Sequence, residues 1–214
     1  MQELLGFAFV SLSAVFFVID PLGLLPIFVA MTADDPPEKR RAMAARAVVF
    51  AFGLLASFAL FGTVVFRLFG ISLEAFKIAG GILLLITALD MLRALPSRTR
   101  SSPEETTEGS AKEDVAIVPL AMPLLAGPGS IATVMVLAAR GTSWRHTGAV
   151  IAAVGLTLVV TYLLLRAAGP LNRLFGQSGI AVLERIMGLL LAAIAIQFVA
   201  DGVMAISRGT GAGS

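Results

Sequence analysis

The sequence predicts an all-α polytopic membrane protein with six transmembrane spans. Of the 214 residues, 57% are hydrophobic and only 14% are charged, whereas a soluble domain has about 25% charged residues. Long apolar runs recur along the whole chain, and each can form a helix that crosses a hydrocarbon core of roughly 30 Å. The net charge of +2 is small, and basic residues lie between apolar runs, so we expect no nucleic-acid binding.

The apolar runs place the six spans in order along the chain. We expect spans at Leu4–Met31, Ala42–Phe69, Ser72–Leu92, Val115–Ala139, Thr147–Ala168 and Gly179–Ile206. The first run lacks a positively charged leader, so we expect a retained span and not a cleaved signal peptide. A polar, Ser/Thr/Glu-rich linker at 94–114 is expected to be disordered. It separates a first three-helix repeat, 1–93, from a second, 115–214.

The distribution of Lys and Arg predicts the orientation of the chain. The loops after the first, third and fifth spans carry eleven of the 16 basic residues. Cytoplasmic loops are enriched in Lys and Arg, so we expect a cytoplasmic linker and both termini on the periplasmic or extracellular side. Because each half has three spans, the second half is then expected to cross the membrane in the opposite sense to the first.

Similar segments recur in the two halves. "IDPLGLLPIFV" in the first span aligns with "AGPGSIATVMV" in the fourth when Pro21 is laid on Pro128. Nearly the same offset lays Lys77 on Arg185 and Gly80 on Gly188 in the third and sixth spans. Inverted-topology repeats with interrupted helices are the architecture of many secondary transporters. Chance similarity between two apolar sequences remains the alternative.

Proline and glycine clusters predict that the first and fourth spans are broken. A proline inside a helix removes a hydrogen bond, and in a membrane such a break persists only within protein or beside a wet cavity. Asp20 suits an N-cap and Pro21 a first helical position, and residues 127–130, Gly-Pro-Gly-Ser, repeat the signal. We therefore expect two half-helices in each span. A role of these kinks in packing alone is the alternative.

Two half-helix N-termini that meet at mid-membrane would favour a zwitterionic ligand. Their unpaired N–H groups attract a carboxylate, and the carboxylate of Asp20 attracts an ammonium group. Ser130 is placed to reach a substrate carboxylate, whereas Gln197 either bonds a neighbouring helix or faces the cavity. The expected substrate-binding residues are Asp20, Pro21, Gly23, Pro26, Gly127, Pro128, Gly129, Ser130, Thr133 and Gln197.

Two other groups of residues have structural explanations. Gly80, Gly81 and Gly188 are expected to allow close packing of helices. Asp90 and Asp201 lie near span ends, where solvation at the membrane interface explains them, and their roles stay open.

The motifs "VIDPLGLLPIF", "PLAMPLLAGPGSIATV", "KIAGGILLLITALDML" and "RIMGLLLAAIAIQFVADGV" resemble those of the MarC family of bacterial inner-membrane proteins. The resemblance covers essentially all six spans. That family includes the SnatA-type neutral amino-acid transporters and is related to the LysE exporter superfamily. The resemblance implies a multi-pass inner-membrane protein that moves small neutral amino acids such as glycine and alanine.

We therefore expect a secondary transporter, working as an exporter or exchanger, with alternating access to a midplane site. A passive channel, or a membrane protein with another substrate, is the alternative, and an intramembrane enzyme is disfavoured because GxGD, HExxH and nucleotide-binding motifs are missing. No cofactor or metal is expected, and coupling to H⁺ or Na⁺ is left open. The expected partners are amino acids and the lipid bilayer. Direction of transport and the possibility of a homo-oligomer are also open.

Overall fold

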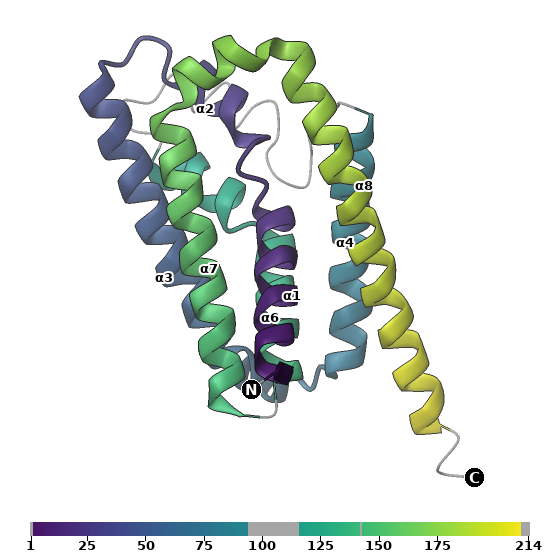
Figure 1. Cartoon of the computed structure of the whole chain (residues 1–214). Coiled ribbons are helices and arrows are strands. Elements are labelled where there is room, and N and C mark those ends of the chain that lie inside the picture. Colours follow the sequence, from purple (N-terminus) through teal and green to yellow (C-terminus); the bar gives the residue numbers. More distant parts are fainter. Residues whose placement is uncertain (1, 94–115, 142, 211–214) are drawn as a thin grey trace.

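The computed structural model describes residues 2–93, 116–141 and 143–210, and the linker predicted at 94–114 lies outside them. All regular elements in these ranges are helical (Figure 1). In order they are α1 (Gln2–Ile19), α2 (Leu24–Met31), α3 (Pro37–Phe69), α4 (Leu73–Leu92), η1 (Ala116–Leu125), α6 (Pro128–Arg140), α7 (Trp144–Arg166) and α8 (Ala168–Thr210).

Four stretches of the described chain are long and apolar enough to cross a membrane as single helices. They are Pro37–Gly62, Leu73–Leu92, Trp144–Arg166 and Ser178–Arg208. Two bent pairs qualify only when their halves are taken together: α1 with α2, bent by 42°, and η1 with α6, bent by 55°. The described chain therefore has four clear spans, or six if each bent pair is one span.

The ends of α3 and α4 carry residues that commonly start or stop helices. α3 begins with Pro37 in its first turn and ends at Gly70, whose φ of 63° is left-handed, a common helix stop. The Ser72 side chain accepts a hydrogen bond from the backbone N–H of Ala75 and so caps α4. These ends lie within a few residues of the predicted second and third spans.

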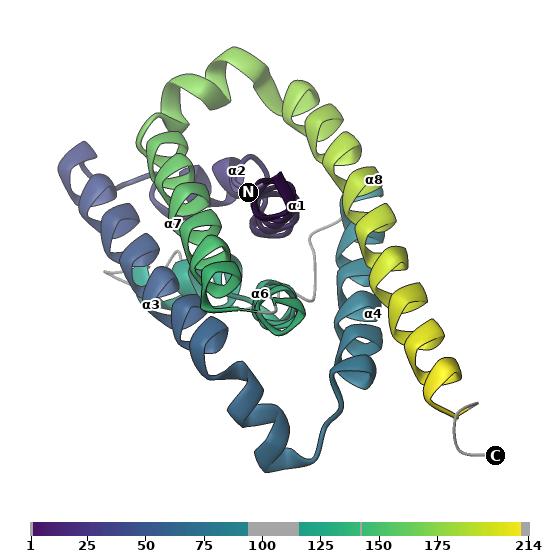
Figure 2. The ribbon, with the colours of Figure 1, turned by 60° about the horizontal axis from the view of Figure 1, so that its bottom comes forward.

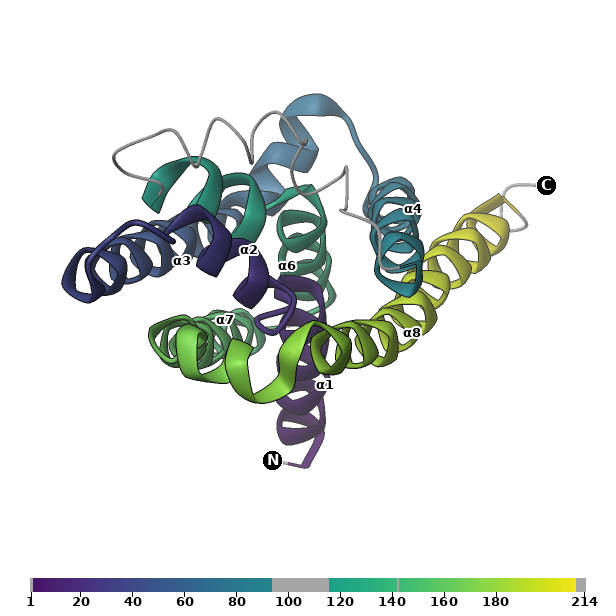
Figure 3. The same cartoon turned by 90° about the horizontal axis from the view of Figure 1, so that it is seen from above.

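α8 departs from the predicted fifth loop. The segment that begins at Ala168 is already helical, and the chain turns at Gly176, where φ is 60° and ψ is 177°. Only glycine adopts this conformation readily. Figure 3 shows the first part of α8 running across the end of the bundle from α7 before the helix turns down alongside α4. The connection after α7 is therefore a surface helix and not an irregular loop.

The helices form three groups. α1 and α6 lie in the centre, with α3 and α7 on one side and α4 and α8 on the other (Figure 2). The start of α1 and the end of α8 lie at one end of the bundle, at the bottom of Figure 1, whereas α2 and the start of α3 lie at the opposite end.

Glycines allow α4 and α8 to pack closely. A Cβ on Gly81 would lie 2.8 Å from the carbonyl oxygen of Ala195, and a Cβ on Gly188 would lie 3.1 Å from the carbonyl oxygen of Ala88. Both distances are shorter than ordinary van der Waals contacts, so only glycine lets the backbones approach this far. This confirms the predicted packing role of Gly81 and Gly188, and small residues serve the same purpose in many membrane helices.

The outward faces of the bundle are apolar. Large hydrophobic side chains such as Phe9, Val49, Leu68 and Leu189 are well exposed. Patches of this extent mark contact with an apolar environment. Together with the lengths of the spans, they indicate contact with the lipid bilayer.

Candidate functional site

The first break is built around Asp20, which ends α1. Its backbone adopts φ 51°, a left-handed conformation that Asp tolerates better than most residues. The Asp20 side chain is 1% exposed, and its Oδ1 accepts a hydrogen bond from the N–H of Gly23 at 3.2 Å. The carboxylate therefore caps the turn that leads into α2, but the N-cap of α2 is Gly23, so the prediction of Asp20 as N-cap and Pro21 as first helical residue is wrong by three residues.

Gly23 must be glycine for the carboxylate to occupy this place. A Cβ on Gly23 would overlap Oδ2 of Asp20. The turn formed by Pro21, Leu22 and Gly23 delays the second half-helix, so α2 begins at Leu24, three residues after Pro21. Pro26 occupies the third position of α2, where the missing N–H has no helical partner in any case.

The second break begins α6. Gly127 has extended backbone, with φ −77° and ψ 174°, and Pro128 occupies the first helical position. A Cβ on Gly127 would lie 2.5 Å from the carbonyl oxygen of Pro123, so this position also requires glycine. The helix start predicted at residues 127–130 is present, and the hydroxyl-bearing Ser130 lies in its first turn.

The segment before this break differs from the prediction. We expected a half-helix, but Val118 and Met122 in η1 have extended backbone, with ψ of 120° at both residues. Pro119 and Pro123 each lack the N–H that a continuing helix needs. The N–H of Ala126 donates to the carbonyl of Ala121, a wide turn. The backbone of η1 is therefore irregular, and the segment is not an α-helix.

A small cavity lies at the second break. It is lined by Val18, Leu84, Thr87, Pro123, Leu124, Gly127, Pro128, Gly129 and Ser130. Its volume is about 20 Å³, and a cavity of roughly 10–15 Å³ is enough for one water molecule. The cavity has room for about one water and is too small for any amino acid.

The two breaks approach each other at this cavity. A Cβ on Gly129 would lie 3.8 Å from Cγ1 of Val18, two residues before Asp20 in the chain. The structure thus brings residues 127–130 together with the end of α1. The Asp20 carboxylate is not part of the cavity wall. Asp20 is buried two residues after Val18, on the turn that its carboxylate caps.

Six of the ten predicted site residues do not line the cavity: Asp20, Pro21, Gly23 and Pro26 belong to the first break, and Thr133 and Gln197 lie in α6 and α8. Thr133 is fully buried in α6, and its Oγ1 has no hydrogen-bond partner among the described residues, but it does not line the cavity. Gln197 has an exposed side chain on α8, and its Nε2 donates to Oδ1 of Asp201 at 2.6 Å. The structure does not bring Gln197 to the cavity wall.

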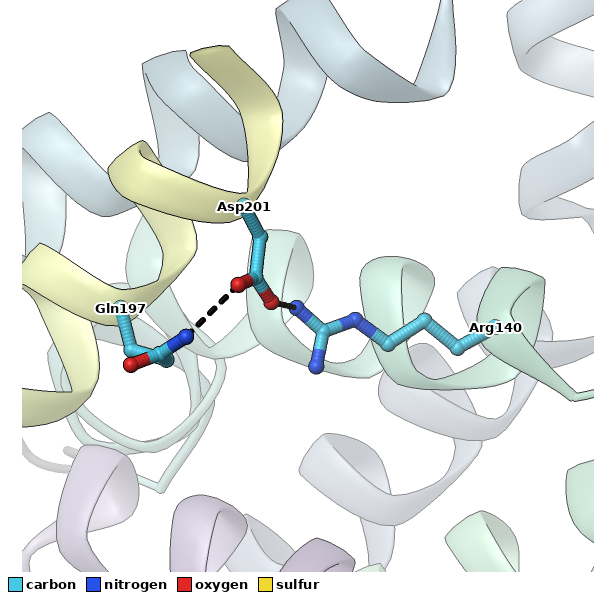
Figure 4. A network of polar contacts seen from close by, with 3 residues as sticks. All are labelled: Arg140, Gln197 and Asp201. Atoms are coloured by element: carbon cyan, nitrogen blue, oxygen red, sulfur yellow. Dashed lines mark hydrogen bonds and ion pairs between the residues drawn. The ribbon is translucent and has the colours of Figure 1, made fainter. Parts of the chain in front are cut away.

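Asp201 belongs to a polar network that joins two helices (Figure 4). Its Oδ2 accepts from Nη2 of Arg140, at the end of α6, at 2.5 Å. The guanidinium of Arg140 also lies 5.1 Å from the ring centre of Phe198, in reach of a cation–π interaction. The sequence explained Asp201 by interfacial solvation, whereas the structure gives this carboxylate two partners.

Leu84 and Thr87 of α4 line the cavity although the sequence did not single them out as site residues. Their position follows from the packing at Gly80, where a Cβ would lie 3.0 Å from the Cβ of Ala132 in α6. Positions four and seven residues later lie on the same helix face. The Thr87 hydroxyl donates to the carbonyl of Leu83 at 3.0 Å, so it is bonded within its own helix. Across the ranges that the structure describes, no three His, Cys, Asp or Glu side chains cluster to hold a metal.

Comparison with known proteins adds an independent line of evidence. Residues 5–207 match the family described as MarC family integral membrane protein. The chain is 40% identical to a UPF0056 membrane protein of Methanocaldococcus jannaschii, with 93% of this chain and 97% of the relative covered. It is 35% identical to UPF0056 membrane protein YvbG of Bacillus subtilis, covering 91% and 92%, and 34% identical to YhcE of Escherichia coli, covering 91% and 90%. No solved structure matches.

Proposed function

The chain belongs to the MarC family of integral membrane proteins, and from this premise we propose that it is a secondary transporter of small neutral amino acids such as glycine and alanine. The observation that carries the proposal is the meeting of two broken spans, one of which holds a buried carboxylate. An ionisable residue inside a membrane-spanning region is expensive and marks a functional site by default. The relatives are named only as membrane proteins, so their names do not indicate a substrate, and the amino-acid substrate is part of the proposal.

The ends of the two breaks suit the two charges of an amino acid. The start of α6 offers backbone N–H groups and the positive end of a helix dipole, which attract a carboxylate. Ser130, in the first turn of α6 and on the cavity wall, adds a hydroxyl donor. Asp20 adds negative charge close to the same cavity, which attracts an ammonium group.

The size of the cavity supports alternating access. At about 20 Å³ it excludes the substrate, so the site must open before binding. Its wall comes from the central helices α1 and α6, from the end of η1, and from α4, which packs tightly on α8. We propose that α4 and α8 move together against the central helices to admit substrate, as one bundle moves against another in many transporters.

The course of the chain supports an inverted repeat. α1 and α2 run from the end of the bundle that holds the start of the chain toward the opposite end, whereas α6 runs the other way (Figure 1). We propose that residues 1–93 and 115–214 are the two repeats and that the side holding 94–114 is cytoplasmic. The SnatA-type branch, the LysE superfamily and coupling to H⁺ or Na⁺ are further parts of the proposal.

Uptake of labelled glycine and alanine into proteoliposomes tests the proposal. We expect saturable flux that falls about 10- to 100-fold in Asp20→Asn, the range for losing one hydrogen bond to a charged group. Asparagine keeps an acceptor for the N–H of Gly23, so this substitution removes charge with little change of geometry. Asp34→Asn, an exposed acid in the turn before α3, is the matched control and should transport normally.

Two outcomes would contradict the proposal. Flux of glycine no greater than in empty liposomes, with folded protein present, would exclude transport of this substrate class. Flux that rises linearly with concentration and is unchanged in Asp20→Asn would indicate a passive channel.

A further inference from the structure

A second cavity lies away from the breaks, at the end of the bundle that holds α2 and the start of α3. Its volume is about 240 Å³, and it is lined by Pro37, Arg40, Arg41, Leu165, Arg166, Gly169 and Pro170. The wall therefore comes from three helices: the first turns of α3, the last turn of α7 and the first turn of α8. Figure 1 shows these helix ends at the top of the molecule.

Three arginines line this one cavity, and no acidic residue does. Among the described residues no ion pair is formed by Arg40, Arg41 or Arg166. The acid nearest to them along the chain, Glu38, is exposed in the first turn of α3 and does not line the cavity, and Asp35 is held by Lys39 at 2.7 Å. Like charges in one hollow repel each other, so the cluster favours a bound anion.

The depth of the cavity fits the headgroup region of a membrane. Arg166 is the last residue of the span Trp144–Arg166, and Arg41 stands directly before the apolar run predicted to begin at Ala42. Arginines at span ends lie where lipid phosphates lie. The guanidinium of Arg40 also lies 5.8 Å from the ring centre of Phe28 on α2, so one wall of the site is ordered by an aromatic contact.

We propose that the cavity formed by Arg40, Arg41 and Arg166 binds the phosphate group of an anion, supplied by an anionic phospholipid headgroup or by soluble phosphate. Guanidinium groups match phosphate oxygens with paired hydrogen bonds, which lysines cannot do. Basic pockets between membrane helices bind anionic headgroups by this chemistry. The site is separate from the breaks, so it stands whether or not the protein transports amino acids.

Titration of the purified full-length protein in detergent tests the site. Short-chain phosphatidylglycerol, phosphatidylcholine and inorganic phosphate are the three probes, and binding is followed by thermophoresis. We expect phosphatidylglycerol to bind in preference to phosphatidylcholine. Arg41→Gln/Arg166→Gln should bind it about thirtyfold more weakly, since each arginine near a membrane surface contributes about fivefold.

The controls separate this site from general electrostatic attraction. Arg145→Gln/Arg208→Gln removes the same charge from exposed positions in the first turn of α7 and the last turn of α8, and should bind like the wild type. If the double variant at the site fails to fold, the single variants Arg41→Gln and Arg166→Gln should each weaken binding about fivefold. Arg41→Lys/Arg166→Lys should bind phosphatidylglycerol with an affinity between those of the wild type and Arg41→Gln/Arg166→Gln, because lysine keeps the charge but cannot form the paired hydrogen bonds.

Each outcome decides the proposal. Preference for phosphatidylglycerol that is lost in Arg41→Gln/Arg166→Gln supports a lipid headgroup as the source. Binding of inorganic phosphate with the same loss, and without a lipid preference, supports soluble phosphate as the source. Equal binding of both lipids and no phosphate binding, or equal weakening by Arg145→Gln/Arg208→Gln, would overturn it.

Discussion

Arg140 and Asp201 join α6 to α8 by an ion pair, with Nη2 2.5 Å from Oδ2. The two side chains are only 28% and 27% exposed, so the pair is partly shielded from water. α6 begins at the cavity between the breaks and ends at this pair. The contact therefore ties the far end of the central helix α6 to the tightly packed pair of α4 and α8.

Breaking this pair should loosen the contact between α6 and α8. We expect Arg140→Gln and Asp201→Asn each to lower the thermal stability of the purified protein, and the two effects not to add. Contacting residues in one network couple by about 0.5–3 kcal/mol. A double-mutant cycle of unfolding in detergent measures this coupling.

The pair of Asp35 and Lys39, four residues apart at the start of α3, is the matched control for that cycle. Asp35→Asn and Lys39→Gln should show a smaller coupling, because an ion pair between residues four apart typically contributes about 0.3–0.5 kcal/mol and joins no two helices. Additive effects of Arg140→Gln and Asp201→Asn would show that the ion pair does not hold the helices together.

The contact between Gly23 and Asp20 makes Gly23→Ala a test of the first break. The added methyl group would overlap the Asp20 carboxylate, so the carboxylate must leave its cap on the turn. We expect a loss of about 1–3 kcal/mol, typical of overpacking, together with loss of the proposed transport. Thermal unfolding and proteoliposome uptake measure the two effects.

Gly6→Ala in α1 is the control, since a Cβ there meets nothing within 4 Å. It should leave stability and uptake unchanged or slightly raise stability, because alanine is the better helix former. If Gly23→Ala is stable and transports normally, the position of the Asp20 carboxylate on the turn is not needed for the proposed transport.

The glycine contacts between α4 and α8 predict that alanine destabilises the protein at position 81 but not at position 53. Gly81→Ala should destabilise the protein by about 1–3 kcal/mol, because the methyl group would lie 2.7 Å from Cγ2 of Val199 and 2.8 Å from a backbone oxygen. Gly53→Ala in α3 should not, since its Cβ meets nothing within 4 Å. Thermal unfolding of both variants measures the difference. Equal effects would contradict the close packing of α4 on α8.

The features that the sequence predicted are those that depend on neighbouring residues. The span lengths follow from apolar runs, and the breaks at Asp20 and Gly127 follow from backbone chemistry that proline and glycine impose on adjacent residues. The irregular path of η1 was missed although Pro119 and Pro123 signal it. Two prolines four residues apart remove two donors from successive helical turns, which no single α-helix accommodates.

The features that were missed depend on contacts between distant segments. Arg140 and Asp201 are 61 residues apart, and only the packing of α6 against α8 brings them together. Thr87 reaches the cavity because Gly80 lets α4 approach α6, and this approach depends on tertiary packing. Residue type alone could not separate a solvated Asp201 from a paired one, because both occur near span ends.

The approach of the two breaks predicts a cross-link across the cavity. The chain has no cysteine, so Val18→Cys/Gly129→Cys introduces the only two thiols. A disulfide needs Cβ atoms about 3.5–4.5 Å apart; a Cβ at position 129 would lie 3.8 Å from Cγ1 of Val18, an atom bonded to the Cβ of Val18, so the two positions are close enough for the cross-link to be tested. We expect mild oxidation to join the two halves, so that a protease site inserted between residues 94 and 115 no longer separates them on a non-reducing gel. Reduction should release them.

The same cross-link also tests whether the cavity must open. Because the disulfide would cross the space between the two breaks, it would occupy the proposed site even when α4 and α8 move away, so we expect it to abolish the proposed amino-acid flux and reduction to restore it. Val18→Cys/Gly155→Cys is the control pair, since Gly155 faces Phe52 of α3, and it should neither cross-link nor lose flux. Failure of Val18→Cys/Gly129→Cys to cross-link in folded protein would mean that the breaks lie apart. Full flux in the cross-linked protein would mean that substrate does not pass between them.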